Sequence, residues 1–339
     1  MKKTTYRFSA QSADYYFDAH FATLGKLVDK KETVLVVDEK VFFNHAAKLK
    51  GWNVIVLKSG EEHKNQDTVD SIIDNLVSMQ ADRKTVLVGI GGGVVTDITG
   101  YVAAIYMRGL RFGFVPTTVL AMVDAAIGGK NGIDLGVYKN LVGTIRQPSF
   151  LLYDFSFLQS LPEAEWMNGF AEIIKHACIR DAAMFKILEQ DSLDNMRKGR
   201  AVLKQLIERN AVLKTKLVQR DEFERGERRL LNFGHTLGHA LEKLYELSHG
   251  QAVAIGMSYA SVLSQKINGF KEAARVIELI EQYGLPANIE FEKEKVFEVM
   301  RMDKKREKQE IHYVLLEKIG KGVVQPISIK QLEKFIGQL

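Results

Sequence analysis

The stretch from residue 85 to 118 constrains the fold most, because an apolar β-rich run leads into three glycines and then into a helical pattern. Gly91, Gly92 and Gly93 stand at this strand-to-helix turn. Glycines there let a ligand approach the backbone closely, and free N–H groups at a helix N-terminus attract anions. Nucleotide or phosphate binding is therefore the first hypothesis. We place Asp97 in the first helical turn, where its carboxylate would support the helix dipole or bind a ligand hydroxyl.

The glycine pattern matches the common dinucleotide-binding motif only in part. Gly89 and Gly91 begin G-x-G, but the third glycine position falls on Val94. The acidic residue that should follow about twenty residues later is missing. The glycine run alone therefore leaves a ligand loop and a tight structural turn as equal alternatives.

Length and composition narrow the class of protein. A chain of 339 residues exceeds the usual size of one domain, so two domains are expected. The net charge of +5 is spread along the chain and argues against nucleic acid as a partner. No apolar run of about eighteen residues exists, so we expect no membrane partner. The single cysteine, Cys178, cannot form an internal disulfide, and we expect a cytoplasmic protein.

The order of elements predicts two halves. Short β-rich runs alternate with amphipathic helices in the first half, which predicts a parallel sheet. The expected strands are 33–37, 53–57, 85–90, 112–115 and 150–153. Long helical patterns follow, with a hairpin at 312–327. We predict an α/β domain with a Rossmann-like parallel sheet at 1–160, a mainly α-helical domain at 161–339, and a site in the cleft between them.

Three histidines and a glutamate form the strongest candidate for a metal site. His235 and His239 are four residues apart on a predicted helix, so their side chains face the same way. Such a pair can bind one metal ion, or one histidine can bind it while the other meets the substrate. His249 begins another helix, and Glu172 offers a carboxylate one turn from Lys175. Core histidines are the alternative. We read the other histidines as structural or surface residues: His20, His45, His63, His176 and His312.

Two further segments carry cations. Gly128 and Gly129 precede Lys130, and Lys139-Asn140 follows, which fits a phosphate loop or equally a glycine-rich surface turn. The segment 214–228 is rich in both charges, and its pattern alone favours a salt-bridged helix end.

Taken together and in this order, nine segments resemble 3-dehydroquinate synthase, a family of the sugar-phosphate cyclase superfamily. The segments are GEEHK (60–64), GGGVVTD (91–97), RGLRFGFVPTT (108–118), VDAAIGGKNGID (123–134), KNLVGTIRQP (139–148), GFAEIIKH (169–176), 214–228, LNFGHTLGHALE (231–242) and HGQAVAIGM (249–257). The resemblance implies conversion of 3-deoxy-arabino-heptulosonate 7-phosphate to 3-dehydroquinate and phosphate. NAD and a divalent metal, usually zinc with cobalt as an alternative, are the implied cofactors.

The resemblance also assigns roles to individual residues. The implied metal ligands are Glu172, His235 and His249. The implied catalytic residues are Lys130, Lys175, Asp124, Asn232 and His239, and the substrate-binding residues are Arg108, Asn140, Lys214, Arg228 and Lys305. The implied NAD-binding residues are Asp38, Glu61, Lys64, Gly92, Gly93, Val94, Asp97, Thr117, Thr118, Lys130, Lys139, Phe157 and Ser160. The family is commonly dimeric, and Arg108 is expected to act across the dimer interface.

The implied reaction explains why so many cations are needed. A transient oxidation by NAD acidifies a neighbouring C–H, phosphate leaves, the hydride returns, and an aldol step closes the ring. Cations that hold phosphate and carboxylate keep the substrate in one conformer.

Five positions depart from the family pattern, and none is a proposed metal ligand or substrate cation. They are Thr96 for glycine, Asn131 for threonine, Asp134 for asparagine, His176 for tyrosine and Gln251 for glutamate. Two alternatives remain: another sugar-phosphate cyclase, and a metal-dependent polyol dehydrogenase that consumes NAD.

Overall fold

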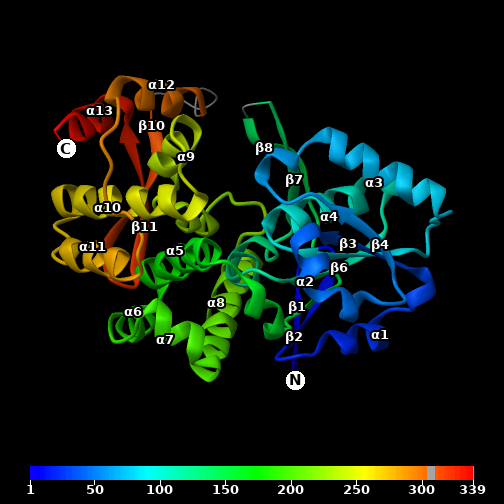
Figure 1. Cartoon of the computed structure of the whole chain (residues 1–339). Coiled ribbons are helices and arrows are strands. Elements are labelled where there is room, and N and C mark those ends of the chain that lie inside the picture. Colours follow the sequence, from blue (N-terminus) through cyan, green and yellow to red (C-terminus); the bar gives the residue numbers. More distant parts are fainter. Residues whose placement is uncertain (137, 304–309, 339) are drawn as a thin grey trace. The chain divides into compact units, whose positions relative to one another are not determined.

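The computed structural model describes residues 1–136, 138–303 and 310–338, which divide into two compact units (Figure 1). Unit 1 comprises 1–166 and 207–223, and unit 2 comprises 167–206 and 224–339. Helices α5 (Glu163–Arg180) and α8 (Arg200–Arg220) each have residues in both units. The stretch 207–223, which the predicted division gives to the helical half, therefore packs with the α/β half.

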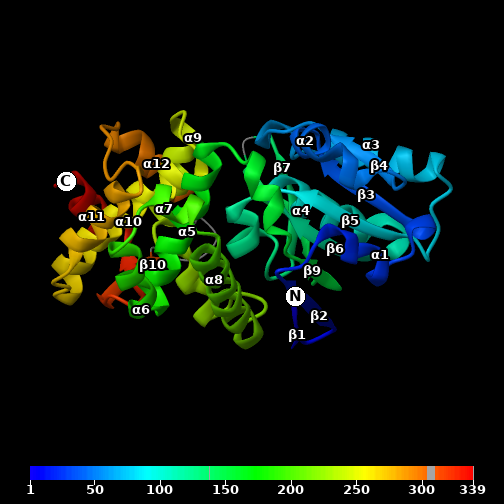
Figure 2. The same cartoon turned by 60° about the horizontal axis from the view of Figure 1, so that its bottom comes forward.

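Unit 1 is built on a seven-stranded sheet in the order β1-β2-β9-β6-β5-β3-β4. β1 pairs antiparallel with β2, and the other neighbouring pairs are parallel. Figure 2 shows this order across unit 1. The strands are β1 (Lys2–Arg7), β2 (Ser12–Phe17), β3 (Thr33–Asp38), β4 (Asn53–Leu57), β5 (Val86–Gly91), β6 (Arg111–Pro116) and β9 (Phe150–Leu152). The five predicted strands are confirmed, whereas the N-terminal hairpin of β1 and β2 was not predicted.

Helices cover both faces of this sheet. Val88 and Ile90 of β5 belong to a core that Val41 and Phe42 of α2 join. Gly89 points to the other face, where Thr99 of α4 packs against it, because successive strand residues alternate between faces. Such two-sided burial explains why β3 and β5 are nearly continuous apolar runs. The helical segments are η1 (Phe21–Thr23), α1 (Leu24–Leu27), η2 (Lys30–Glu32), α2 (Glu39–Leu49), η3 (Glu61–His63), α3 (Gln66–Ser78), α4 (Gly93–Ile105), η4 (Tyr106–Arg108), η5 (Ala121–Ala125) and η6 (Phe155–Ser160).

A separate hairpin of β7 (Lys130–Leu135) and β8 (Tyr138–Ile145) completes unit 1. The segment that we read as a phosphate loop or surface turn thus continues into a strand at Lys130.

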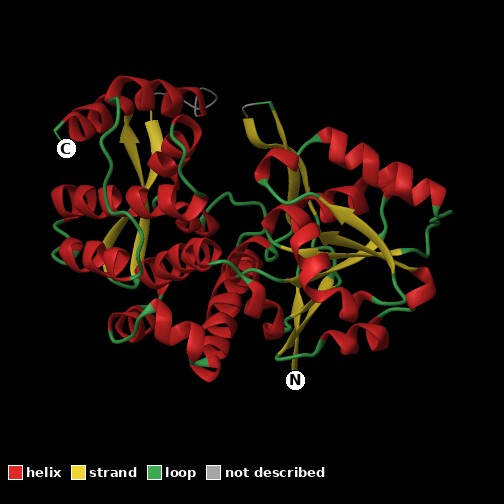
Figure 3. Cartoon of the chain, in the orientation of Figure 1, coloured by secondary structure: helices red, strands yellow, loops and turns green. Residues whose placement is uncertain are grey.

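Unit 2 is mainly helical, with one hairpin among its helices (Figure 3). Besides parts of α5 and α8 it contains α6 (Ala182–Glu189), α7 (Leu193–Lys198), η7 (Glu227–Asn232), α9 (His235–Leu244), α10 (His249–Asn268), α11 (Ala273–Gln282), α12 (Lys293–Asp303), β10 (Glu310–Lys318), β11 (Lys321–Ser328) and α13 (Ile329–Gly337). The predicted fold class, an α/β half followed by a mainly helical half, is confirmed. Among the described residues no helix is both long and apolar enough for a membrane span.

Candidate functional site

The glycine turn forms as predicted at the carboxyl edge of the sheet in unit 1. β5 ends at Gly91, Gly92 precedes the helix, and α4 starts at Gly93. The Gly91 carbonyl accepts a hydrogen bond from Thr117 N at 2.9 Å, which joins this turn to the end of β6. A Cβ at Gly92 would lie 3.1 Å from Thr118 Cγ2, so a side chain there would crowd the loop. The glycine turn thus leads directly into the N-terminus of α4, and such helix ends attract anions.

Asp97 does not lie in the first turn of α4, and this part of the prediction is wrong. The helix begins at Gly93, and its first turn holds no acidic residue. Asp97 instead forms an ion pair with Lys64, with Oδ2 and Nζ 2.6 Å apart.

The buried Lys64 is the centre of a polar cluster. Its side chain is 5% exposed, it also donates to Asn140 Oδ1 at 2.7 Å, and Glu61 lies 3.8 Å away. Burial alone would lower the pKa of Lys64, but the charges of Asp97 and Glu61 outweigh it and raise that pKa. Asn140 has a positive φ of 53°, and Asp134 holds its backbone N–H at 2.7 Å. The cluster thus joins three predicted cofactor residues to one predicted substrate residue.

The loop before Lys130 is held by Asn131. The Asn131 amide donates to the carbonyls of Gly129 at 2.8 Å and Arg146 at 2.9 Å, and the residue is 5% exposed. A Cβ at Gly100 of α4 would overlap Asn131 Oδ1, so the asparagine fits only because residue 100 is glycine. This pairing explains how the chain accepts asparagine where the family often has threonine.

Two other departures from the family pattern also have structural explanations. Thr96 lies inside α4, where its hydroxyl donates to the Gly93 carbonyl at 3.0 Å, so the helix accommodates a β-branched residue. Gln251 completes a capping box with Ser248 at the start of α10. Glutamine fills this role as glutamate would.

Asp124 and Lys214 form a second ion pair in unit 1. Lys214 Nζ lies 2.7 Å from Asp124 Oδ1 and also donates to the Asp124 carbonyl at 2.8 Å. Asp124 belongs to η5, and a Cβ at Gly93 would lie 3.3 Å from Ala125 of the same segment. The pair therefore lies beside the glycine turn rather than at a solvated helix end.

The remaining predicted cofactor residues differ in their burial and in their hydrogen bonds. Asp38 caps α2 through Lys40 N at 2.9 Å, and it also accepts from Ser59 Oγ. Asp38 therefore serves as the N-cap of α2. Phe157 is 1% exposed, so its ring belongs to the core, whereas Ser160 is exposed. Lys139 is exposed on β8, and Val94 is half-buried in the first turn of α4.

Arg108 lies away from the glycine turn. It follows the C-terminus of α4, a helix of 13 residues and thus about 20 Å long, so the length of that helix separates it from Gly93. Met107, Arg108 and Gly109 have φ of 50°, 65° and 127°. Positive φ is unfavourable for Met107 and Arg108, so this turn is a strained segment of the backbone.

Unit 2 contains a group of three side chains that could hold a metal ion. Glu172 Oε1 lies 3.5 Å from His235 Nε2 and 3.3 Å from His249 Nε2, and Glu172 is fully buried. Neighbouring ligand atoms of a tetrahedral site with bonds of about 2.0–2.1 Å lie about 3.3–3.4 Å apart. The three ligands therefore fit a zinc-type ion with one coordination position left over.

Close packing of two helices brings the histidines together. A Cβ at Gly238 of α9 would lie 2.8 Å from the Ala252 carbonyl of α10, and one at Gly256 would overlap the Gly234 carbonyl. Gly234, with φ of 81°, starts α9 at His235. The glycines that border the histidines in the sequence thus serve helix packing, which sets the place of His235 relative to His249.

The second nitrogen of each ligand histidine also has a partner. His235 Nδ1 lies 3.1 Å from the Phe233 carbonyl, and His249 Nδ1 lies 3.5 Å from Glu242 Oε2. Such partners orient the ring and leave Nε2 for a metal. Burial and then Lys175 lower the pKa of His235. Burial also lowers the pKa of His249, but hydrogen bonds to Glu172 and Glu242 outweigh it and raise the pKa to about 10. The carboxylates that favour a charged imidazole also favour a metal cation.

Two other predicted residues of unit 2, Lys175 and His239, lie beside this group. Lys175 is buried and forms an ion pair with Glu172 Oε2. His239 is exposed outside the ligand group, with its ring centroid 5.1 Å from that of His235. Arg228 is buried on η7. Lys305 lies outside the described residues.

Glu224 contacts the predicted catalytic residue Asn232, and the sequence did not predict this contact. The Asn232 amide donates to Glu224 Oε1 at 2.7 Å, and Glu224 has a positive φ of 57°. Glu224 lies in the charged segment 214–228, but nothing in the sequence distinguishes it from the other acidic residues of that segment.

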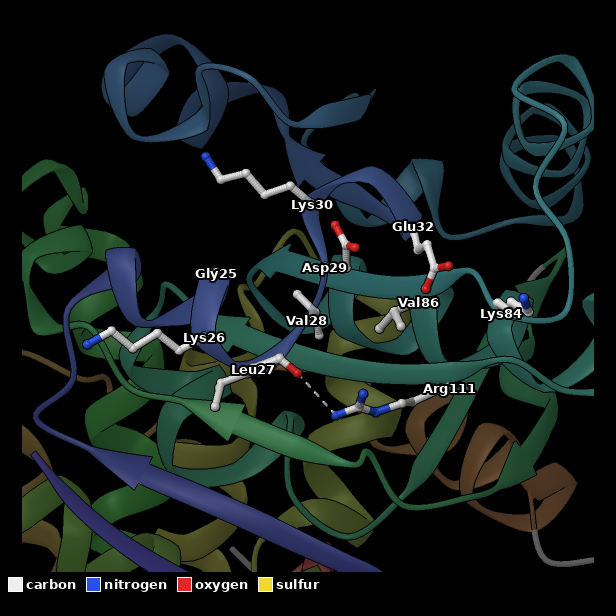
Figure 4. A pocket seen from close by; sticks show the side chains of 10 residues that line it. All are labelled: Gly25, Lys26, Leu27, Val28, Asp29, Lys30, Glu32, Lys84, Val86 and Arg111. Carbon is white, nitrogen blue, oxygen red and sulfur yellow. Dashed lines mark hydrogen bonds between the residues drawn. The ribbon is translucent and has the colours of Figure 1, made fainter.

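Unit 1 also has a pocket of about 660 Å³, which is lined by none of the residues of the glycine turn (Figure 4). It is at the amino ends of the strands, because Val86 and Arg111 begin β5 and β6 and Glu32 precedes β3. Arg111 donates there to the Leu27 carbonyl at 3.4 Å. The pocket contains none of the predicted site residues, which agrees with ligand binding at the opposite edge of such sheets.

Comparison with known proteins matches both halves of the chain to one family. The model of the 3-dehydroquinate synthase N-terminal region matches residues 54–168, and that of the C-terminal region matches residues 169–306. The chain belongs to the 3-dehydroquinate synthase family.

Whole-length relatives support the same membership. The 3-dehydroquinate synthase of Pyrococcus abyssi is 40% identical over 288 residues, covering 84% of this chain and 85% of that protein. The 3-dehydroquinate synthase of Campylobacter curvus is 35% identical over 331 residues, covering 94% of each. Among solved structures, 2-epi-5-epi-valiolone synthase from Streptomyces hygroscopicus with NAD⁺ and Zn²⁺ bound has a TM-score of 0.87 and 28% identity. That match covers 98% of this chain and 99% of the other.

Proposed function

We propose that this chain is a 3-dehydroquinate synthase, an enzyme that converts 3-deoxy-D-arabino-heptulosonate 7-phosphate to 3-dehydroquinate and phosphate in aromatic amino acid biosynthesis. The observation that carries the proposal is the group of Glu172, His235 and His249, whose spacing suits a divalent metal. This group lies in the part of the chain that matches the C-terminal family model, and the relatives at 35–40% identity bear this name.

NAD and a divalent metal, zinc or cobalt, are the proposed cofactors. Glu172, His235 and His249 would hold the metal. NAD would lie at the glycine turn, on the cofactor residues named from the sequence. The domain at 1–160 would bind NAD and the domain at 161–339 would bind the metal, except that the stretch 207–223 packs with the first. When bound, NAD accepts and returns a hydride while the metal lowers the pKa of a substrate hydroxyl.

The chain's own residues bind and orient the substrate. The ammonium groups of Lys130 and Lys175 and the guanidinium of Arg228 suit the phosphate and carboxylate of the substrate. Lys214 is oriented by Asp124 at 2.7 Å, and Asn232 by Glu224 at 2.7 Å. Further proposed contacts with substrate come from Asn140, His239, Arg108 and Lys305. Holding one conformer in this way favours phosphate elimination and ring closure.

We further propose that the protein forms a homodimer and is located in the cytoplasm. Arg108 lies at the far end of α4 from the glycine turn, on a strained turn beside exposed Met107. This placement supports a role for Arg108 in the site of a second copy. The single cysteine suits a reducing compartment.

A substrate comparison tests the proposal. Purified protein with NAD and zinc is given 3-deoxy-arabino-heptulosonate 7-phosphate, a heptulose 7-phosphate or glucose 6-phosphate, and released phosphate is measured. We expect release from the first compound alone. Release only from the other two compounds would indicate a sister cyclase and would contradict the proposal.

A further inference from the structure

Two side chains of α2 hold η6, the short segment that follows β9. His45 Nε2 lies 2.8 Å from Ser160 Oγ. Lys48 Nζ donates to Asp154 Oδ2 at 2.9 Å and to Ser156 Oγ at 2.8 Å. The two contacts lie at the two ends of η6, so α2 fixes the segment at both its start and its finish.

Phe157, one of the two buried side chains of η6, contacts both of these α2 residues. The ring of Phe157 is 4.8 Å from the ring of His45, centroid to centroid, and Lys48 Nζ lies 4.9 Å over it. On another side Phe21 packs edge-on against Phe157 at 5.9 Å. Phe157 therefore cannot rotate without disturbing both His45 and Lys48.

Asp154 ties the beginning of η6 to the rest of unit 1. Its carboxylate is 3% exposed and accepts hydrogen bonds from Phe21 N at 2.9 Å, Ser156 N at 2.9 Å and Ser156 Oγ at 2.6 Å. A buried carboxylate with several donors is held rigidly, since each lost partner would leave charge unpaired in the interior. Lys48 thus binds a carboxylate that several other hydrogen bonds already hold.

The backbone of α2 is deformed where this contact is made. His45 has φ of −130° and ψ of 25°, which are not helical values, so the helix kinks at this residue. The kink directs the imidazole toward Ser160 while the N-terminus of the helix remains capped by Asp38 at the end of β3. α2 therefore connects the carboxyl end of β3 to the segment that follows the carboxyl end of β9.

We propose that His45 and Lys48 are positioning residues that hold η6 in the form that binds the cofactor. The inference rests on the proposed function, in which η6 and Asp38 both contribute to the NAD site. A segment already fixed in its bound conformation loses less entropy when the ligand arrives, so the contacts strengthen binding without touching the ligand. They should leave the chemical steps unchanged once NAD is bound.

Titration calorimetry of the full-length protein with NAD tests this inference. His45→Ala and Lys48→Met should each raise the dissociation constant of NAD about fivefold, the effect of a lost hydrogen bond. His45→Gln, whose amide reaches the position of Nε2, should restore binding to within about twofold of the wild type. The matched control is His312→Ala, which alters an exposed histidine of unit 2 and should bind NAD as the wild type does.

Steady-state kinetics separate positioning from a general loss of stability. The KM for NAD should rise in His45→Ala and Lys48→Met, while kcat at saturating NAD stays within about twofold of the wild type. Unchanged NAD affinity in both variants would overturn the inference, and so would a loss that His45→Gln does not restore. Failure of the wild-type protein to bind NAD at all would instead overturn the proposed cofactor, so the two failures are distinguishable.

Discussion

Gly100→Ala should damage the protein although alanine is the better helix former. Gly100 is buried in α4, and an added Cβ would overlap Asn131 Oδ1. The asparagine must then move, and its hydrogen bonds to the carbonyls of Gly129 and Arg146 are lost. Lys130 lies between these partners in the chain, so the substitution should reach the proposed catalytic lysine.

The magnitude follows from the contacts. The Gly129 carbonyl keeps a hydrogen bond from Arg146 N at 2.8 Å, whereas the Arg146 carbonyl and the Asn131 amide lose partners. Unsatisfied buried polar groups cost about 1–3 kcal/mol, and the alanine contributes about 1 kcal/mol of helix propensity in the opposite direction. We expect a net loss of about 2 kcal/mol in the free energy of unfolding, or a fall of about 4–8 °C in Tm. Displacement of Lys130 should slow phosphate release about tenfold or more.

Thermal unfolding and phosphate release are measured for Gly100→Ala and for a matched control, Gly337→Ala. Gly337 is also helical, but a Cβ there meets nothing within 4 Å, so the control should be neutral or slightly stabilised. Asn131→Ala alone should cost about 2 kcal/mol, and the double variant should cost no more, because the alanine then has room. A Tm for Gly100→Ala equal to that of Gly337→Ala, or strictly additive losses in the double variant, would refute the reasoning.

Three further outcomes follow from the site. Glu242→Gln should weaken zinc binding about 10–100-fold in chelator competition, and His235→Ala should weaken it more; equal affinity in wild type and both variants would contradict the metal group. Lys214→Met should cost about 3 kcal/mol in urea unfolding because Asp124 loses its partner; an unchanged midpoint would show that the pair is unimportant. Burial raises the pKa of Asp154, but hydrogen bonds from Ser156 and Lys48 outweigh it and hold that pKa below 3.8. Asp154→Asn should therefore lower Tm at pH 7, and the difference in Tm from the wild type should shrink as pH falls below about 4. A difference in Tm that does not change with pH would exclude a role for the charge.

The parallel sheet could be predicted from sequence because its strands are buried on both faces. Runs such as 33–37 and 85–90 have no polar residue to interrupt them, and turn residues follow each run. The β7–β8 hairpin lacks this signal, since most residues of β8 are exposed and the strand has no apolar alternation. Its pairing is set instead by contacts distant in sequence, such as the Asp134 N–H donating to the Lys64 carbonyl.

Helical spacing pairs His235 with His239, which lies outside the candidate ligand group, so spacing alone does not predict the three candidate metal ligands. The resemblance to the family singles out His235 and His249, and in the structure their ligand atoms lie close to a carboxylate oxygen of Glu172. The supporting residues were not predictable in the same way. Glu242 partners His249, and His45 contacts Ser160, through folding of segments that share no local pattern.

Phosphate released per NAD present tests the central claim most directly. The protein is incubated with zinc, a limiting amount of NAD and an excess of 3-deoxy-arabino-heptulosonate 7-phosphate, while phosphate and NADH absorbance are followed together. The account predicts many phosphates per NAD with no net accumulation of NADH, since each hydride removed is returned. NADH that builds up in step with product would contradict it and would identify a dehydrogenase.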